Sequence, residues 1–109
     1  MRVIILPEVV DYFLELADIL YEKGYLGFED TAIQYAKKLF QDIQKNLPNK
    51  SSKKAPKYFD RYGQGMLYTF FKRNRDTSWY VFFNIYKTKD ETIYFVRHVS
   101  NNHVVAQFL

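Results

Sequence analysis

Apolar residues recur at helical spacing through most of the first half of the chain. A short apolar stretch over residues 2–6 predicts a strand, and a proline directly after it suits the first turn of a helix. Apolar side chains three and four residues apart then predict helices over residues 8–23 and 28–46. Gly24 and Pro48 are expected to end them, and the short connection makes them an antiparallel pair. The predicted buried positions are Val10, Phe13, Leu14, Ala17, Leu20 and Tyr21 in the first helix, and Ala32, Tyr35, Ala36, Leu39, Phe40, Ile43 and Leu47 in the second.

After a polar, irregular middle, the period of the apolar pattern changes from a helical repeat to alternation. Segments 66–72, 78–86 and 92–98 are rich in aromatic and β-branched residues and predict strands. Polar turns between them favour an antiparallel meander, and residues 104–109 are a candidate for a last short strand. The pattern therefore predicts a single α+β domain covering all 109 residues: an N-terminal strand, an antiparallel helix pair, then a three- or four-stranded antiparallel sheet.

The predicted strand over 78–86 is apolar or aromatic on both faces. Because two helices cover only one face of a sheet, we expect the other to be a partly exposed aromatic surface flanked by Lys72, Arg73 and Arg97. Such a surface suits nucleobase stacking with phosphate contact, or a protein partner. The alternative is additional core beneath the basic segment. The two alternating sets are Trp79, Val81, Phe83 and Ile85 on one face, and Tyr80, Phe82, Asn84 and Tyr86 on the other.

Composition excludes several classes of protein. Aromatic residues make up 19% of the chain and hydrophobic residues 48%, which is enough buried surface to offset the entropy of ordering and argues against disorder. There is no cysteine, so there is no disulfide framework and no thiol nucleophile. No apolar run approaches the length of a membrane span, and the first residues do not resemble a signal peptide. We therefore expect a cytoplasmic protein without a membrane partner.

The positive charge of the chain is concentrated in one segment. Between Lys45 and Arg75 there are nine Lys or Arg residues and one Asp, whereas residues 1–44 carry eight acidic and four basic residues. A basic segment beside an acidic one is typical of a polyanion-binding surface, although a solvated lysine-rich loop has the same composition.

The polar residues of the second half suit RNA cleavage without a metal or another cofactor. There is no phosphate-binding glycine loop and no Gly-x-Ser-x-Gly elbow, and two histidines are too few for a histidine-based zinc site. RNA cleavage needs a base for the ribose 2′-hydroxyl, a cation for the phosphate and an acid for the leaving oxygen. A structural role is the alternative for either histidine. The residues that suit this chemistry are Tyr58, Arg61, Lys72, Arg73, Arg75, Arg97, His98, Asn101, Asn102 and His103.

The whole chain resembles the RelE/ParE superfamily of type II toxin–antitoxin toxins. The resemblance is carried by the opening strand and two helices, the basic link, the strand from Ser78 to Tyr86, and the segment from Ile93 to His103. It departs from the nuclease pattern in two places, with Trp79-Tyr80 where arginine opens the central strand and Asn101-Asn102 where a cation is common.

The resemblance implies a ribosome-associated endoribonuclease that cleaves mRNA, inhibits translation and is neutralised by an antitoxin protein packed on the exposed aromatic surface. A binding module of the same fold, similar to the gyrase inhibitors or a degenerate toxin, is the alternative. On this interpretation the catalytic candidates are His103, His98 and Arg73, with Asn102 as a second choice for the C-terminal turn. The candidates for RNA or phosphate binding are Lys53, Lys54, Lys57, Arg61, Lys72, Arg75, Arg97, Asn101 and Asn102, and those for stacking or partner binding are Tyr58, Tyr80 and Phe82.

Overall fold

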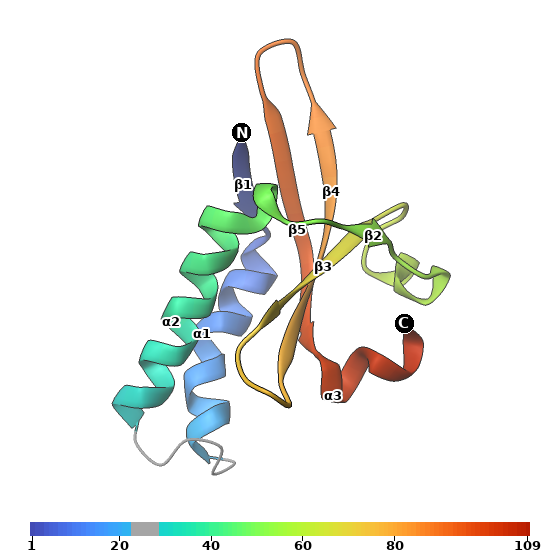
Figure 1. Cartoon of the computed structure of the whole chain (residues 1–109). Coiled ribbons are helices and arrows are strands. Elements are labelled where there is room, and N and C mark those ends of the chain that lie inside the picture. Colours follow the sequence, from blue (N-terminus) through green and yellow to red (C-terminus); the bar gives the residue numbers. More distant parts are fainter. Residues whose placement is uncertain (23–28) are drawn as a thin grey trace.

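The computed structural model describes residues 1–22 and 29–109 and has an α+β organisation with two long helices beside one sheet (Figure 1). The predicted helix end at Gly24 and the predicted start at Phe28 lie outside the described residues. In chain order the elements are β1 (Arg2–Ile5), α1 (Pro7–Glu22), α2 (Glu29–Asn46), η1 (Leu47–Asn49), β2 (Lys53–Lys54), η2 (Lys57–Arg61), β3 (Leu67–Lys72), β4 (Ser78–Lys87), β5 (Thr92–Asn101), α3 (Asn102–Val105) and η3 (Ala106–Phe108).

The sheet has five strands in the order β1-β5-β4-β3-β2 and is mixed rather than antiparallel. β1 runs parallel to β5, with Ile5 opposite Val96, while the other neighbours are antiparallel. The four strands β2 to β5 are antiparallel, as predicted, whereas the N-terminal strand, for which no partner was predicted, makes the sheet mixed and five-stranded. A parallel pair needs a long connection, and here all the elements from α1 to β4 lie between β1 and β5. The pattern of residues 2–5 carries no information about which strand they will join.

The helices follow the predicted periodicity with two exceptions. α1 begins at Pro7, whose fixed φ suits the first helical position, and α2 ends at Asn46, directly before the 3₁₀ turn that contains Pro48. The positions expected to be buried in α1 include Leu14 and Tyr21, but these side chains are 72% and 47% exposed. The apolar stripe of α1 is thus wider than the face that the sheet and α2 cover.

The main core lies between the helix pair and one face of the sheet. Trp79, Val81 and Phe83 of β4 point into it, as the alternation in that strand predicts. They pack with the buried sides of both helices and with neighbouring strands, namely Val9, Phe13, Leu16, Ala17, Ala32, Ala36, Leu39, Ile43, Leu47, Phe71, Val96 and Val99.

A second, smaller core lies on the opposite face of the sheet. Phe82 is fully buried there with Phe59, Met66 and Val105, because η2 and the C-terminal turns fold over the middle of β4 and β5. The expectation that Phe82 lies on an exposed surface is therefore wrong, and the alternative of additional core is correct for this part of the face. The segment 104–109, expected to be a strand, instead forms the short turns of α3 and η3 that supply this cover.

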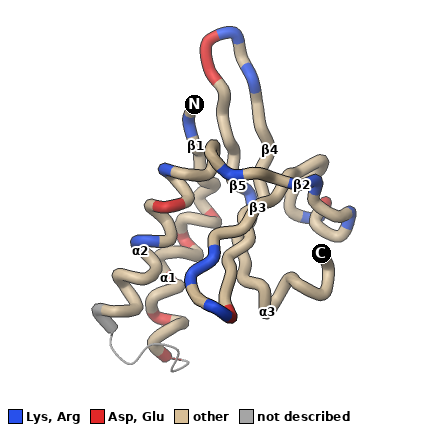
Figure 2. The backbone as a smooth tube through the Cα atoms, in the orientation of Figure 1, with Lys and Arg blue, Asp and Glu red and all other residues tan. Residues whose placement is uncertain are grey.

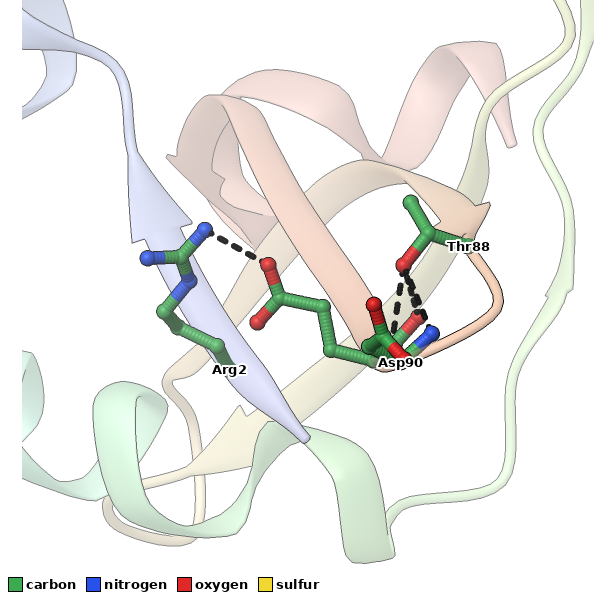
Figure 3. A network of polar contacts seen from close by, with 4 residues as sticks. Arg2, Thr88 and Asp90 are labelled. Atoms are coloured by element: carbon green, nitrogen blue, oxygen red, sulfur yellow. Dashed lines mark hydrogen bonds and ion pairs between the residues drawn. The ribbon is translucent and has the colours of Figure 1, made fainter.

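The β4–β5 hairpin extends beyond the other strands, and hydrogen bonds stabilise its turn (Figures 1 and 3). Arg2 of β1 donates a hydrogen bond to the carboxylate of Glu91 at 3.0 Å. The Thr88 hydroxyl accepts the backbone N–H groups of Asp90 and Glu91 at 3.3 and 3.1 Å. These contacts satisfy the turn locally, as short polar side chains in turns commonly do.

Candidate functional site

The basic segment runs from the end of α2 across the edge of the sheet to η2, and returns through β3 to the turn before β4 (Figure 2). It includes the short edge strand β2, the η2 turn and the connection between β3 and β4. The exposed cations that it contributes are Lys53, Lys54, Lys57, Arg61, Lys72 and Arg75. Lys53 lies on the face of Tyr68, opposite the helices, whereas Lys54 lies on the face of Leu67, so the exposed cations follow the edge of the sheet and favour contact with an anionic partner there.

A β-bulge in β5 brings two functional candidates onto the same face. Phe82 pairs with His98 while Phe83 pairs with Val96, so Arg97 is the extra residue. Val96 and Val99 both face the main core, which leaves Arg97 and His98 together on the opposite side of the strand. Bulges commonly re-aim side chains in this way beside functional sites.

The bulge opens into a groove of about 590 Å³, which we call the β5 groove. His98, Arg97 and Ser100 come from β5, whereas Arg61 and Tyr62 come from the end of η2 and the residue after it. Leu6, the residue before α1, and Val99 of β5 also line the groove. Glu8, Val9 and Tyr12 of α1 and Val104 of α3 close it. Two arginines and a histidine from distant parts of the sequence therefore line one open hollow.

His98 is held by stacking between aromatic side chains. Its imidazole lies parallel to the ring of Tyr62, with centroids 3.8 Å apart and an interplanar angle of 3°, and is 5.6 Å from Phe82. Burial lowers the pKa of His98 below the ordinary value. The imidazole is therefore neutral at neutral pH, with one nitrogen able to accept a proton.

Arg97 is fixed by polar contacts on the same face. Its Nε donates to the Asn84 side-chain oxygen at 2.6 Å, and one terminal nitrogen donates to the Tyr86 hydroxyl at 2.9 Å. The guanidinium lies 4.8 Å from the ring centre of Phe95. A Cβ at position 63 would lie only 2.5 Å from Cδ of Arg97, so Gly63 permits this close approach. Arg97 is thus a preorganised positive charge at the groove.

Arg61 reaches the groove from η2. Its Nε donates to the backbone oxygen of Tyr58 at 3.0 Å, and its guanidinium carbon lies 3.9 Å above the Tyr58 ring. Tyr58 in turn stacks on Phe108, with ring centres 3.7 Å apart. Tyr58 therefore supports Arg61 and the C-terminal turn, rather than presenting a free ring for a base.

A second feature of this face is a row of aromatic rings on β3 and β4, which we call the aromatic strip: Tyr68, Phe70 and Tyr80. Ring centres are 6.0 Å apart for Tyr68 and Tyr80 and 5.8 Å apart for Phe70 and Tyr80. Phe70 is 48% exposed. Lys53 pairs directly with Tyr68 across the strands, and directly paired residues share a face. Exposed rings beside lysines offer stacking surfaces and phosphate contacts.

The structure places Arg73 away from both features. Its guanidinium forms an ion pair with Asp42 of α2, and its Nε is buried without a hydrogen-bond partner in the described part of the chain. Burial by itself raises the pKa of Asp42. Hydrogen bonds from Asn46 and Arg73, together with the charges of Arg73 and Lys50, outweigh this effect and hold the pKa below its ordinary value. Arg73 therefore links the β3–β4 turn to α2. The other two catalytic candidates, His98 and His103, lie in other parts of the structure.

Asn101 and Asn102 serve the backbone. The Asn101 side chain caps α3 by accepting the N–H of His103 at 3.0 Å. The Asn102 amide accepts the N–H of Ser78 at 2.9 Å and donates to the oxygen of Asp76 at 3.0 Å. Asn101 and Asn102, which were both predicted to bind phosphate, therefore connect the C-terminal turn to neighbouring parts of the backbone.

His103 and His98 line different hollows. His103 is exposed, its Nε2 lies 3.4 Å from the Thr77 hydroxyl, and it borders a pocket on the helix side with Tyr12 and Trp79. The sequence therefore indicated suitable residue types but not which of them meet. Tyr62 and Phe70 were missed as site residues, and the only signals for them were an aromatic residue inside the basic segment and an aromatic residue at an alternating position of a strand.

No family model, curated protein or solved structure matches this chain. Among residues 1–22 and 29–109, no three His, Cys, Asp or Glu side chains are grouped as metal ligands would be. No helix within the same ranges is long and apolar enough to cross a membrane.

Proposed function

We propose that this protein is a toxin of the RelE/ParE type that cleaves mRNA on the ribosome and is neutralised by an antitoxin. The observation that carries this proposal is the β5 groove, where a neutral histidine lies in one hollow with two arginines. The order of strand, helix pair and sheet is consistent with the family resemblance. Arg61 and the exposed lysines of the basic segment, among them Lys53 on the face opposite the helices, supply the charge that an RNA partner needs.

The groove has groups for transesterification at a ribose. His98 would accept the proton of the 2′-hydroxyl, and the 2′-oxygen would form its bond to phosphorus as the bond from phosphorus to the 5′-oxygen breaks. Arg61 and Arg97 would stabilise the added negative charge on the phosphate oxygens. The leaving 5′-oxygen takes a proton from solvent at the open mouth of the groove. The products are a 2′,3′-cyclic phosphate and a 5′-hydroxyl.

The aromatic strip would hold the RNA beside this groove. Base stacking is worth about 1–3 kcal/mol per base and tolerates any sequence. Lys53 and Lys72 lie beside the strip and would contact the backbone phosphates. This arrangement predicts binding of single-stranded RNA with little sequence preference and a strong dependence on salt.

The matched pair of histidines provides the test. Induced expression should arrest growth, and the purified protein should cut mRNA in a translating extract, with cyclic phosphate ends. His98→Asn should reduce cleavage by about 100-fold or more, whereas His103→Asn, in the other hollow, should remain within about threefold of the wild type. Equal loss in both variants, or no cleavage by the wild type, would reject the assignment.

A non-catalytic binding module of the same fold is the second candidate, and the contacts of Arg97 favour it. This guanidinium is already engaged by Asn84 and Tyr86, and His98 is already stacked. On this second interpretation both side chains are structural parts of a docking face for an antitoxin or another protein. Recovery of a small protein partner, together with intact RNA in the translating extract, would support this candidate over the nuclease.

A further inference from the structure

A pocket of about 370 Å³ lies on the helix side of the sheet and shares Tyr12 and Val104 with the neighbouring β5 groove. It is bounded by α1 and α2, the β3–β4 turn and the first turn of α3. Its volume is within the range of small-ligand sites in proteins. We call it the tryptophan pocket, because the single tryptophan of the chain, Trp79, lines it.

The walls of the tryptophan pocket are aromatic and apolar. Trp79 is 2% exposed, and its indole N–H donates to the Tyr35 hydroxyl at 2.8 Å, which fixes the ring. The Tyr35 and Tyr12 rings each lie 6.5 Å from that of Trp79, at interplanar angles of 62° and 57°. Leu16 and Ile19 of α1 complete the wall. Because Trp79 and Leu16 are almost fully buried, the partly exposed rings of Tyr12 and Tyr35 provide the surface on which a planar apolar ring can lie.

The rim of the pocket carries polar side chains. Asn74 and Thr77 come from the β3–β4 turn and His103 from α3. The Asn74 oxygen accepts the N–H of Asp76 at 2.9 Å, which leaves its amide N–H groups to donate outward. No Lys, Arg, Asp or Glu is among the described residues that line the pocket. The occupant is therefore uncharged where it is buried, because burying an unpaired charge is costly.

We propose that the tryptophan pocket binds a nucleobase. A base is a neutral planar heteroaromatic ring whose faces stack on aromatic side chains and whose edge hydrogen-bonds to amide and hydroxyl groups such as those of Asn74 and Thr77. Arg75 lies exposed in the turn that carries Asn74 and Thr77, where it can contact an attached phosphate. The choice of a base among planar rings rests on the proposed action on RNA. The base can belong to a free nucleoside or to an RNA strand.

Trp79 allows the proposal to be tested directly. Each of the four ribonucleosides is titrated into the intact protein while tryptophan emission is excited at the red edge of its absorption, with ribose 5-phosphate as the control that lacks a ring. A saturable change in emission is expected for at least one nucleoside and none for the control. Competition by a short single-stranded RNA then shows whether a base within a strand occupies the same pocket.

A pocket-filling variant provides the second arm. Ile19→Phe should weaken nucleoside binding by about tenfold or more, whereas the matched change Ile33→Phe, at a 44% exposed position of α2, should have no effect. Asn74→Ala tests the rim if Ile19→Phe does not fold, and should weaken binding severalfold. Absence of any saturable change, or binding unaltered by both pocket variants, overturns the proposal. RNA cleavage that depends on His98 would survive that result, and nucleoside binding without RNA cleavage would instead reject only the proposed nuclease function.

Discussion

Replacement of Phe82 by alanine tests whether the face opposite the helices has a core of its own. Phe82 is 0% exposed, and its ring stacks on that of Phe59 with centres 4.3 Å apart. Phe59 belongs to η2, which leads into Arg61 and Tyr62 at the β5 groove. The substitution should therefore loosen the cover that positions these two residues, in addition to lowering the free energy of unfolding.

The magnitude follows from burial. Burying a whole phenylalanine side chain is worth about 1.5–3 kcal/mol, and the enclosed cavity left by truncation brings the expected loss for Phe82→Ala to about 3–5 kcal/mol. Phe70 is the matched control because it is the same residue type on the same face but is 48% exposed. Phe70→Ala should cost about 1 kcal/mol, since about half of the transfer free energy is at stake and no enclosed cavity forms.

Urea unfolding, followed by circular dichroism and by Trp79 fluorescence, measures both losses. A domain of this size has a free energy of unfolding of about 5–15 kcal/mol, so Phe82→Ala should shift the midpoint far more than Phe70→Ala does. Equal losses for the two variants, or a loss below about 1 kcal/mol for Phe82→Ala, would show that η2 and the C-terminal turns do not form a packed core over β4.

Three further predictions concern electrostatics and close packing. Asp42→Asn should lower the free energy of unfolding at neutral pH by about 2 kcal/mol, because the guanidinium of Arg73 loses its partner. The pKa of Asp42 is lowered in the folded chain, so the stability difference between wild type and Asp42→Asn should be complete above an ordinary aspartate pKa of about 4. It should vanish as the pH falls through the lowered pKa of the folded chain, and urea unfolding at neutral and at acidic pH measures this change. Burial lowers the pKa of His98, so the unfolded chain binds its proton more readily; the melting temperature should fall as pH drops below about 6.5, and His98→Gln should flatten that dependence. Gly63→Ala places a Cβ 2.5 Å from Cδ of Arg97 and should cost about 1–3 kcal/mol while shifting the Arg97 Nε resonance; an unmoved resonance would contradict this geometry.

The helices and the three long strands could be predicted because their signals are local. A helix or strand that buries one side repeats its apolar positions with its own period, so α1, α2 and β4 are visible in the chain before any partner is known. The errors arose where burial depends on the partner. Leu14 has the spacing of a core residue but lies outside the covered face, and Phe82 lies beneath η2, whose sequence has no periodic apolar pattern.

The candidate site was predictable as a set of residue types and a charged segment, but not as a constellation. The stacking of His98 on Tyr62 depends on the bulge in β5 and on the return of η2 over the sheet, and neither leaves a periodic signal. Arg73 has a residue type and a position in the sequence that suit phosphate binding. Its ion pair with Asp42 could not be predicted, because the two residues are 31 positions apart.

The amino-acid sequence by itself determined the two amphipathic helices, the aromatic strands and the concentration of positive charge between Lys45 and Arg75. Tertiary structure alone decided that β1 joins β5 in parallel, and that the two histidines face separate hollows. The physical reason is range. Periodicity and charge density are properties of neighbouring residues, whereas register, coverage and side-chain partners are chosen by contacts between segments that are distant along the chain.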